Sequence, residues 1–230
     1  MNNILVIGNS SGIGLEVTKQ LLALGHAVAG ISKSPGAIDN GGYRHFMLDV
    51  RSGQFKAKLE ELAAEEPPFD ACVYCAGIGE ELDLDRLAFD VEVLDVNVRG
   101  AMVAAACFIP GMLRRKAGHI VVLSSLADEL VSPDAPAYFA SKAALSSYFE
   151  GLGLALRPKG VVVTNIRFGF VDTKMAKSPV KPFLLKPSAA AAVVVAALGH
   201  RRVRVSRPLS MALLAKILRF LVGVRLWCCR

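Results

Sequence analysis

A serine, a tyrosine and a lysine stand at a spacing that suits proton transfer. Ser125 ends an apolar run, Tyr138 follows thirteen residues later, and Lys142 comes four residues after that. On a helix, positions i and i+4 share one face, so this lysine would hold a cation beside the tyrosine. A free tyrosine titrates near 10, and bringing it close to neutrality takes roughly three units, or about 4 kcal/mol. A cation in a partly desolvated cleft favours the tyrosinate in this way.

Two elements must position these side chains. Residues 118–123 form a short, β-branched run bounded by glycine, which predicts a buried strand with the serine at its carboxyl end. Pro136 suits the first turn of a helix, and residues 137–156 are rich in Ala and Leu, which favours a helix that carries the tyrosine and the lysine. Tyr-x-x-x-Lys is common on helices that have no catalytic role, so further motifs in the chain are needed to identify this one as catalytic.

A glycine-rich turn near the start of the chain predicts a phosphate cradle. An apolar run at 3–8 leads into the segment Gly8-Asn9-Ser10-Ser11-Gly12-Ile13-Gly14, and a helix is predicted at 15–24. The glycines permit a tight turn and close backbone approach, and the helix N-terminus offers free N–H groups. The spacing is G-x-x-x-G-x-G rather than the usual G-x-G-x-x-G.

The end of the second predicted strand, 25–31, bears on the choice of dinucleotide. An acidic residue is expected about twenty residues past the glycines when the ribose 2′-hydroxyl is bound. Ser32 and Lys33 stand there instead, and a hydroxyl with a cation suits a 2′-phosphate. We therefore expect NADP(H) to be preferred, with NAD(H) as the alternative cofactor. An ordinary solvated loop lysine is the other interpretation of Lys33.

Strands and helices alternate along the rest of the chain. This alternation predicts an α/β fold, a doubly wound parallel sheet of the Rossmann type in one domain, 1–200, with an extension at 201–230. Further strands are predicted at 43–48, 69–74, 118–124, 161–167 and 202–206, and helices at 84–116 and 188–198. Ligands of such sheets bind at the carboxyl ends of the strands. Six candidate residues fall at those ends: Gly12, Ser32, Asp49, Gly77, Ser125 and Gly169.

Taken in order, these motifs resemble the short-chain dehydrogenase/reductase family over residues 3–199. The matching segments are Gly8-x-x-x-Gly12-Ile13-Gly14, Asp49-Val50, Cys75-Ala76-Gly77, Asn97-Val98-x-Gly100, Ser125, Tyr138, Lys142 and 167–173. The resemblance implies an NAD(P)-dependent oxidoreductase, a carbonyl reductase or alcohol dehydrogenase. It would transfer hydride between nicotinamide and a ketone or secondary alcohol, and we expect that small molecule to be lipophilic or carrier-linked. A dinucleotide-binding regulator or scaffold without turnover is the alternative.

The resemblance also implies roles for individual residues. Tyr138 would give a proton to the substrate oxygen, Ser125 would orient that oxygen, Lys142 would hold the nicotinamide ribose and lower the tyrosine pKa, and Asn97 would anchor a water. The implied cofactor-binding residues are Gly8, Ser10, Ser11, Gly12, Ile13, Gly14, Ser32, Lys33, Asp49, Val50, Ala76, Gly77, Tyr138, Lys142, Gly169, Val171 and Thr173. In the same comparison Asp49 resembles the residue that meets adenine, and Thr173 the one that meets the nicotinamide amide. A metal site is not predicted.

Three departures from the family pattern stand out. Tyr74 replaces the usual asparagine-rich start of its turn. Phe168 stands where the family has proline before Gly169, which predicts a looser loop over the nicotinamide. Gly151 and Gly153 lie inside the catalytic helix, where each costs about 1 kcal/mol against alanine, and they could allow a partner helix to pack closely.

Charge is unevenly distributed along the chain, whose net charge is +7. Asp172 is the last acidic residue, and twelve Lys or Arg follow it. Such asymmetry predicts a surface that meets something anionic. The apolar stretch 208–230 is interrupted by Lys216, Arg219 and Arg225, which favours a docked or interfacial helix over a spanning one. An acidic membrane surface or an acidic carrier is therefore a candidate partner, and nucleic acid is not, since no recognition motif is present.

Cysteines and apolar helices complete the predictions. Five cysteines, an odd number without framework spacing, suit a reducing cytoplasm, and no secretory segment is predicted. We expect a cytoplasmic protein, with peripheral membrane contact as an addition; Cys228-Cys229 could be acylated. The helices 84–116 and 137–156 carry apolar residues beyond what one sheet face covers, which predicts a homodimer or homotetramer. The examples are Met102, Cys107 and Phe149.

Overall fold

The computed structural model describes residues 1–176 and 180–228. Its centre is a seven-stranded parallel sheet in the order β3-β2-β1-β4-β5-β6-β7. The strands are β1 (Asn3–Ile7), β2 (Ala27–Ser32), β3 (Tyr43–Met47), β4 (Ala71–Tyr74), β5 (His119–Ser125), β6 (Val162–Phe168) and β7 (Arg204–Arg207). The strand order reverses between β1 and β4, so the predicted doubly wound sheet is confirmed, and its switch point lies beside the glycine-rich turn.

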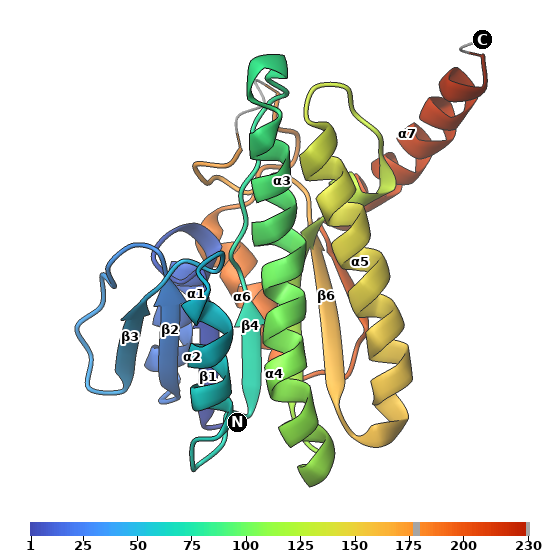
Figure 1. Cartoon of the computed structure of the whole chain (residues 1–230). Coiled ribbons are helices and arrows are strands. Elements are labelled where there is room, and N and C mark those ends of the chain that lie inside the picture. Colours follow the sequence, from blue (N-terminus) through green and yellow to red (C-terminus); the bar gives the residue numbers. More distant parts are fainter. Residues whose placement is uncertain (177–179, 229–230) are drawn as a thin grey trace.

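Helices cover both faces of the sheet (Figure 1). The helices α2, α4 and α5 pack over one face, and α1 and α6 pack over the other, each side with its own apolar core. Central strands such as β1 and β5 are buried almost throughout, because a parallel sheet is covered on both faces. The helices are α1 (Gly12–Ala23), α2 (Gln54–Ala63), α3 (Ala88–Leu94), α4 (Gly100–Arg115), α5 (Pro136–Leu156), α6 (Pro187–Leu198) and α7 (Leu209–Cys228).

The helical stretch from α3 to α4 contains one turn of different geometry. The π-helix η2 (Asp95–Arg99) joins α3 to α4, so the three form one continuous rod at 88–115. Within the described part of the chain, this rod is the helical stretch long and apolar enough to cross a membrane by length and composition, and 44% of its most apolar window is buried. A core helix of a folded domain has the same properties.

The structure corrects two expectations about α5. A Cβ atom at Gly153 would lie 3.0 Å from the Val163 carbonyl oxygen and 3.0 Å from Val203 Cγ1, so this glycine lets α5 approach the chain's own sheet. Its expected role in packing a partner helix is therefore wrong, while Gly151 has open space around it. Phe149, expected as surplus apolar surface, is fully buried in the core between α5 and the sheet.

Some sequence predictions fall outside what the structure describes. Cys229 lies outside the described residues, and the side chain of Cys228 does too. Of the remaining cysteines, Cys72 is a buried free thiol and Cys75 a partly buried one, and desolvation raises the pKa of Cys75 to about 12. Among the described residues, no group of three or more His, Cys, Asp or Glu side chains is arranged to hold a metal ion.

Candidate active site

Asn97 is fully buried in the π-helix η2, where its amide ties together two other segments. Its Nδ2 donates to the Ile78 carbonyl at 2.8 Å and to Ser141 Oγ at 2.9 Å, and its Oδ1 accepts from the Ile78 N–H at 2.8 Å. The loop after β4 is therefore fixed to η2 and to α5 at once. Both amide hydrogens of Asn97 are used, so the predicted water would have to donate a hydrogen bond to an oxygen atom of this residue.

Lys142 places its ammonium group at the centre of the site. It is buried on α5, and its Nζ donates to the Leu123 carbonyl at 3.0 Å and lies 5.6 Å from the centroid of the Tyr138 ring. A Cβ atom at Gly77 would stand 3.4 Å from Asn97 Oδ1 and 3.7 Å from Lys142 Nζ. Gly77 after β4, Asn97 on η2 and Lys142 on α5 are thus neighbours.

Tyr138 packs against the same loop, since a Cβ atom at Gly79 would lie 2.5 Å from its Cδ2. Burial raises the pKa of Tyr138, a hydrogen bond with Ser125 opposes this, and the negative charge of Asp128 raises the pKa further. In the protein alone desolvation therefore outweighs the opposing hydrogen bond, and the fall in the tyrosine pKa expected in the presence of the cofactor stays a prediction. Burial also lowers the pKa of Lys142 to about 8.

Ser125 ends β5 with its hydroxyl anchored on the neighbouring strand. Its Oγ donates to the Phe168 carbonyl at 3.2 Å and accepts from the Ala127 N–H at 3.1 Å. Phe168 continues β6 and pairs with Arg207, and the Gly169 N–H donates to the Arg207 carbonyl at 2.9 Å. Sheet pairing therefore continues through Phe168 to the Gly169 N–H, and the looseness expected of the loop beyond Gly169 stays a prediction.

The glycine-rich turn has the geometry of an anion cradle. Gly8 and Gly12 have φ of +86° and +54°, and a Cβ atom at Gly8 would overlap the Ala76 backbone. Helix α1 begins at Gly12, its N-cap Ser11 makes no side-chain cap bond, and the first turn holds no acidic residue. The first-turn N–H groups therefore suit a pyrophosphate. Two further predicted residues of the turn, Ser10 and Ile13, are partly buried.

Two more observations support a nucleotide above this cradle. A Cβ atom at Gly12 would lie 3.3 Å from Thr173 Cγ2, so the loop after β6, with buried Val171, reaches back to the glycine turn. The buried Oδ1 of Asn9 has no hydrogen-bond partner within the described residues, although its Nδ2 donates to the Tyr43 hydroxyl at 2.5 Å. An orphaned buried acceptor in a glycine cradle fits a site completed by a ligand.

The predicted adenine end is held less tightly. Ser32 Oγ donates to the Ser34 carbonyl at 2.7 Å, and Lys33 is exposed. Arg51 donates to the Asp49 carboxylate from its guanidinium, at 2.7 Å, and from its backbone N–H, at 2.9 Å, and these hydrogen bonds hold the pKa of Asp49 below its usual value. Val50 is buried beneath them. Sequence reasoning missed Arg51, a second cation at this end.

Tyr74 is a positioning residue that the motifs did not identify. Its hydroxyl donates to the Val96 carbonyl at 2.5 Å, and a Cβ atom at Gly100 would overlap that hydroxyl. The tyrosine thus wedges under the π-helix one residue before Asn97, and Gly100 leaves room for it. This departure from the family pattern has a local purpose, because π-turns leave carbonyl groups that need other donors.

A buried ion-pair network beside the site was also missed. Arg167 donates to Asp128 at 2.5 Å and to Glu129 at 2.8 Å, and both pairs are almost fully buried. Asp128 also accepts from Ser146 Oγ at 2.5 Å, and burial raises its pKa. Arg219 of α7 donates to Glu129 at 2.9 Å. The sequence did carry one signal of this network, which is the position of Arg167 inside an apolar strand. A charge buried there needs a partner of opposite charge.

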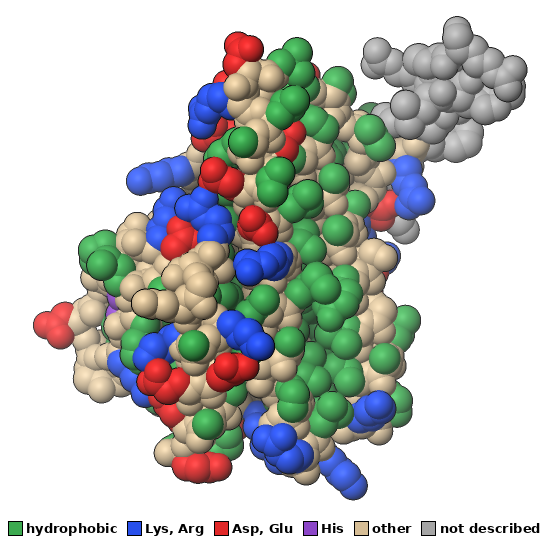
Figure 2. Space-filling view, in the orientation of Figure 1, with side chains coloured by type: hydrophobic (Ala, Val, Ile, Leu, Met, Phe, Trp, Pro, Cys, Tyr) green, Lys and Arg blue, Asp and Glu red, His purple; other side chains and the backbone are tan. Residues whose placement is uncertain are grey.

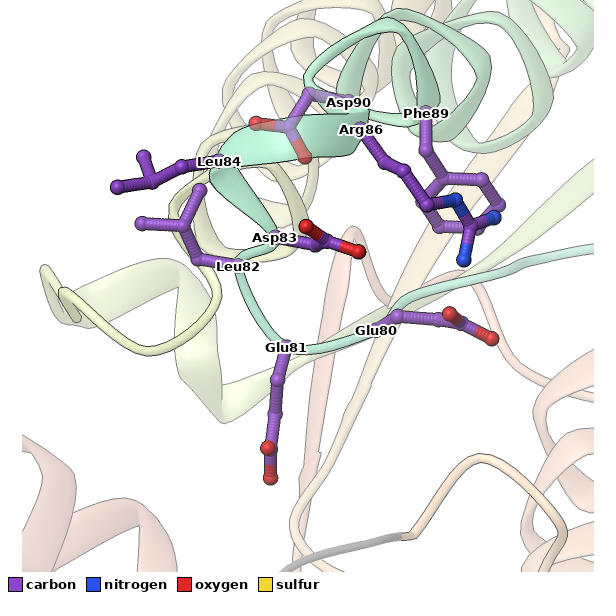
Figure 3. A pocket seen from close by; sticks show the side chains of 8 residues that line it. All are labelled: Glu80, Glu81, Leu82, Asp83, Leu84, Arg86, Phe89 and Asp90. Atoms are coloured by element: carbon purple, nitrogen blue, oxygen red, sulfur yellow. The ribbon is translucent and has the colours of Figure 1, made fainter.

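A cavity of about 590 Å³ lies near the site, at the loop before α3 (Figure 3). Its wall is half acidic and comes from one segment: Glu80, Glu81, Leu82, Asp83, Leu84, Arg86, Phe89 and Asp90. The Leu82 N–H donates to the Asp134 carbonyl at 2.6 Å, which fixes this segment beside the loop that leads into α5. None of the predicted site residues lines the cavity.

Known proteins with the same arrangement identify the family. The family model described as short chain dehydrogenase matches residues 2–182. Since that match covers most of the sequence, the chain belongs to the short-chain dehydrogenase family. Solved short-chain dehydrogenases share its fold.

Three relatives illustrate the similarity. An uncharacterized oxidoreductase of Myxococcus xanthus is 34% identical over 70% of this chain and 66% of its own length. Human 17-beta-hydroxysteroid dehydrogenase type 1 is 31% identical over 74% of this chain and 57% of its own. A solved short chain dehydrogenase of Burkholderia cenocepacia, in complex with NADP, has a TM-score of 0.83 and 20% identity, covering 96% and 97% of the two chains. The chain spans less than two thirds of both curated relatives.

Proposed function

We propose that this protein is an NADPH-dependent carbonyl reductase that converts a lipophilic ketone to a secondary alcohol. The observation that carries the proposal is that Asn97 and Lys142 meet at Gly77 while Tyr138 packs on Gly79 of the same loop, with Ser125 at the end of the adjacent strand. Bound NADPH would supply the hydride. The residues around it would bind the nucleotide and handle the proton.

Tyr138 is the proton donor of the proposed reduction. Its raised pKa keeps the hydroxyl protonated at physiological pH, and a protonated tyrosine can donate to a developing alkoxide. Ser125 would exchange its long bond to the Phe168 carbonyl for one to the substrate oxygen. Lys142, protonated below pH about 8, would stabilise the negative charge left on Tyr138 and bind the ribose.

Cofactor and substrate preferences rest on local charge. Ser32 and the cations Lys33 and Arg51 lie at the predicted ribose end, which supports NADP(H), and the Burkholderia relative binds NADP. Exposed Met175, Phe183 and Leu184 in the segment after β6 favour an apolar substrate. The acidic segment 80–90 favours an uncharged ketone over a carrier-linked one. The human relative is named for a steroid substrate.

The test is NADPH oxidation with ketones graded by apolar size, compared between the wild type and Tyr138→Phe. We expect turnover that rises with apolar size and disappears in the variant, while NADPH binding measured by calorimetry is unchanged. NADPH binding without turnover on any ketone would instead favour the dinucleotide-binding regulator. A failure to bind either dinucleotide would refute both.

The proposal includes self-association, which is common in this family, and a cytoplasmic location. Figure 2 shows hydrophobic side chains gathered over α4 and α5. Exposed large side chains there include Met102, Tyr148 and Leu154, while Cys107 is partly buried. Light scattering at micromolar concentration should give a dimer or tetramer, and a monomer would count against this part.

A further inference from the structure

The helix α7 presents an apolar stripe that the described part of the chain leaves exposed. Figure 1 shows α7 leaving the body of the molecule beyond β7, with the end of the chain at its tip. Leu209, Leu213 and Ile217 are spaced by four residues, so they lie along one side of the helix, and they are 67%, 63% and 53% exposed. Leu214 and Leu218 widen the stripe and are also exposed.

The opposite side of α7 is the one held by the protein. The helix contacts η3 (Leu126–Glu129) and β7. Ala215 is buried, and a Cβ atom at Gly169 would lie 2.9 Å from Met211 Sδ. Arg219 donates to Glu129 at 2.9 Å. These contacts fix which face of the helix turns outward.

The sequence continues the stripe with a basic character. Residues Phe220, Val224 and Trp227 extend the spacing of three or four beyond Ile217. The segment 208–230 contains Lys216, Arg219, Arg225 and Arg230 and no Asp or Glu. Arg219 has its counter-ion in Glu129, but the segment supplies none for Lys216, Arg225 and Arg230. Pairing with a second copy would bring these cations together, whereas an anionic surface would neutralise them.

We propose that α7 docks this protein on anionic lipid bilayers, with its outer apolar stripe in the interface and its basic residues other than Arg219 among the headgroups. An apolar stripe combined with basic residues is the pattern of interfacial helices. Basic residues near such a surface are attracted within about one Debye length, so added salt weakens the attachment. The inner face keeps its contacts with η3 and β7, so docking requires no unfolding of the helix.

The test uses full-length protein and vesicles of phosphatidylcholine with or without phosphatidylserine. The chain has a single tryptophan, Trp227, whose emission reports burial in lipid. We expect a blue shift and cosedimentation with the anionic vesicles, both reduced by raising the salt from 0.05 to 0.5 M. Leu213→Gln/Ile217→Gln should lower the partition coefficient by about tenfold or more. The control Leu24→Gln/Met47→Gln removes two equally exposed side chains far from α7 and should change it less than about twofold.

Three results would overturn the proposal. The first is equal binding to neutral and anionic vesicles, or none to either. The second is a blue shift that grows with protein concentration without lipid, which would indicate pairing with a second copy. The third is a stronger response to soluble poly-glutamate than to vesicles, which would indicate an acidic protein. Circular dichroism of both variants ensures that lost binding is not lost folding.

Discussion

The two ends of the predicted nucleotide site differ in how the protein holds its polar groups. At the catalytic end, Asn97 and Lys142 are buried and make short hydrogen bonds to three different segments. At the adenine end, Lys33 is exposed, and the Asp49–Arg51 pair lies in a partly exposed turn. The first arrangement suits chemistry, where preorganised groups act strongly. The second suits discrimination by charge, where water screens each contact.

This difference ranks the effects of substitution. Buried groups that act together should produce large and cooperative losses when one is removed. Exposed cations should produce small changes that depend on salt. Each prediction below tests whether the two ends behave in these different ways.

The largest effect is expected for Tyr138→Phe. The variant loses the proton donor but keeps the ring, so kcat should fall by about 10³-fold or more, while the Kd for NADPH changes less than about threefold. Stopped-flow reduction and calorimetry measure the two quantities. An equal loss of rate and of NADPH affinity would show that this residue binds cofactor rather than donating the proton.

Asn97→Ala should damage both rate and stability. It removes three hydrogen bonds and leaves the Ile78 backbone groups buried, which should cost about 3 kcal/mol at about 1 kcal/mol per bond. Urea unfolding measures this cost, and initial rates should fall by about 10²-fold or more. Asn9→Ala, at the cradle, is the comparison and should leave turnover at saturating NADPH nearly intact. Equal loss of turnover in both variants would contradict the distinction between the two ends.

The pH profile should respond to Asp128. Lys142 is charged below pH about 8, so we expect the reduction rate to fall as pH rises through that value. The negative charge of Asp128 raises the pKa of both Lys142 and Tyr138. Asp128→Asn removes that charge, so both pKa values decrease and the fall in rate moves to lower pH. An unchanged profile in a folded variant would exclude this influence.

Tyr74→Phe should have a smaller effect, which lowers kcat and leaves the KM for NADPH unchanged. It breaks the hydrogen bond to the Val96 carbonyl next to Asn97, which should cost about 1 kcal/mol of stability and lower kcat about fivefold to tenfold. The KM for NADPH should not change, since the cradle is untouched. The matched control Tyr148→Phe removes an exposed hydroxyl and should change neither the stability nor kcat. A shift in KM in place of kcat would assign Tyr74 to the cofactor end.

Lys33→Ala should give the smallest effect. Losing one exposed cation should reduce the preference for NADPH over NADH by about fivefold, or about 1 kcal/mol. The ratio of kcat/KM for the two cofactors measures this preference, and added salt should reduce the difference. A wild type that prefers NADH would contradict the assignment of Ser32 and Lys33.

The fold could be predicted from sequence because local signals agreed with one another. Apolar runs of strand length alternated with helical patterns, and glycines marked the turns between them. The side-chain contacts could not be predicted, because they depend on packing between distant segments. Tyr74 looked like a weak match until its hydroxyl was located on the Val96 carbonyl, where Gly100 leaves the space.

Electrostatics were the least predictable part. The spacing of Tyr138 and Lys142 indicated an interaction, but not how deeply burial would desolvate both groups. In the protein alone, desolvation raises the pKa of Tyr138. The burial of Arg167 with Asp128 likewise follows from the position of η3 over β6, which no linear pattern indicates.

The ion pair between Arg219 and Glu129 has a thermodynamic consequence. Glu129 also pairs with Arg167, and Arg167 pairs with Asp128, whose charge acts on Tyr138 and Lys142. A partner of α7 that weakens or strengthens the Arg219–Glu129 pair would therefore change the electrostatic environment of Tyr138 and Lys142. Linkage makes such coupling reciprocal, so a nucleotide or ketone bound in the cleft would alter the affinity of α7 for its partner by the same factor.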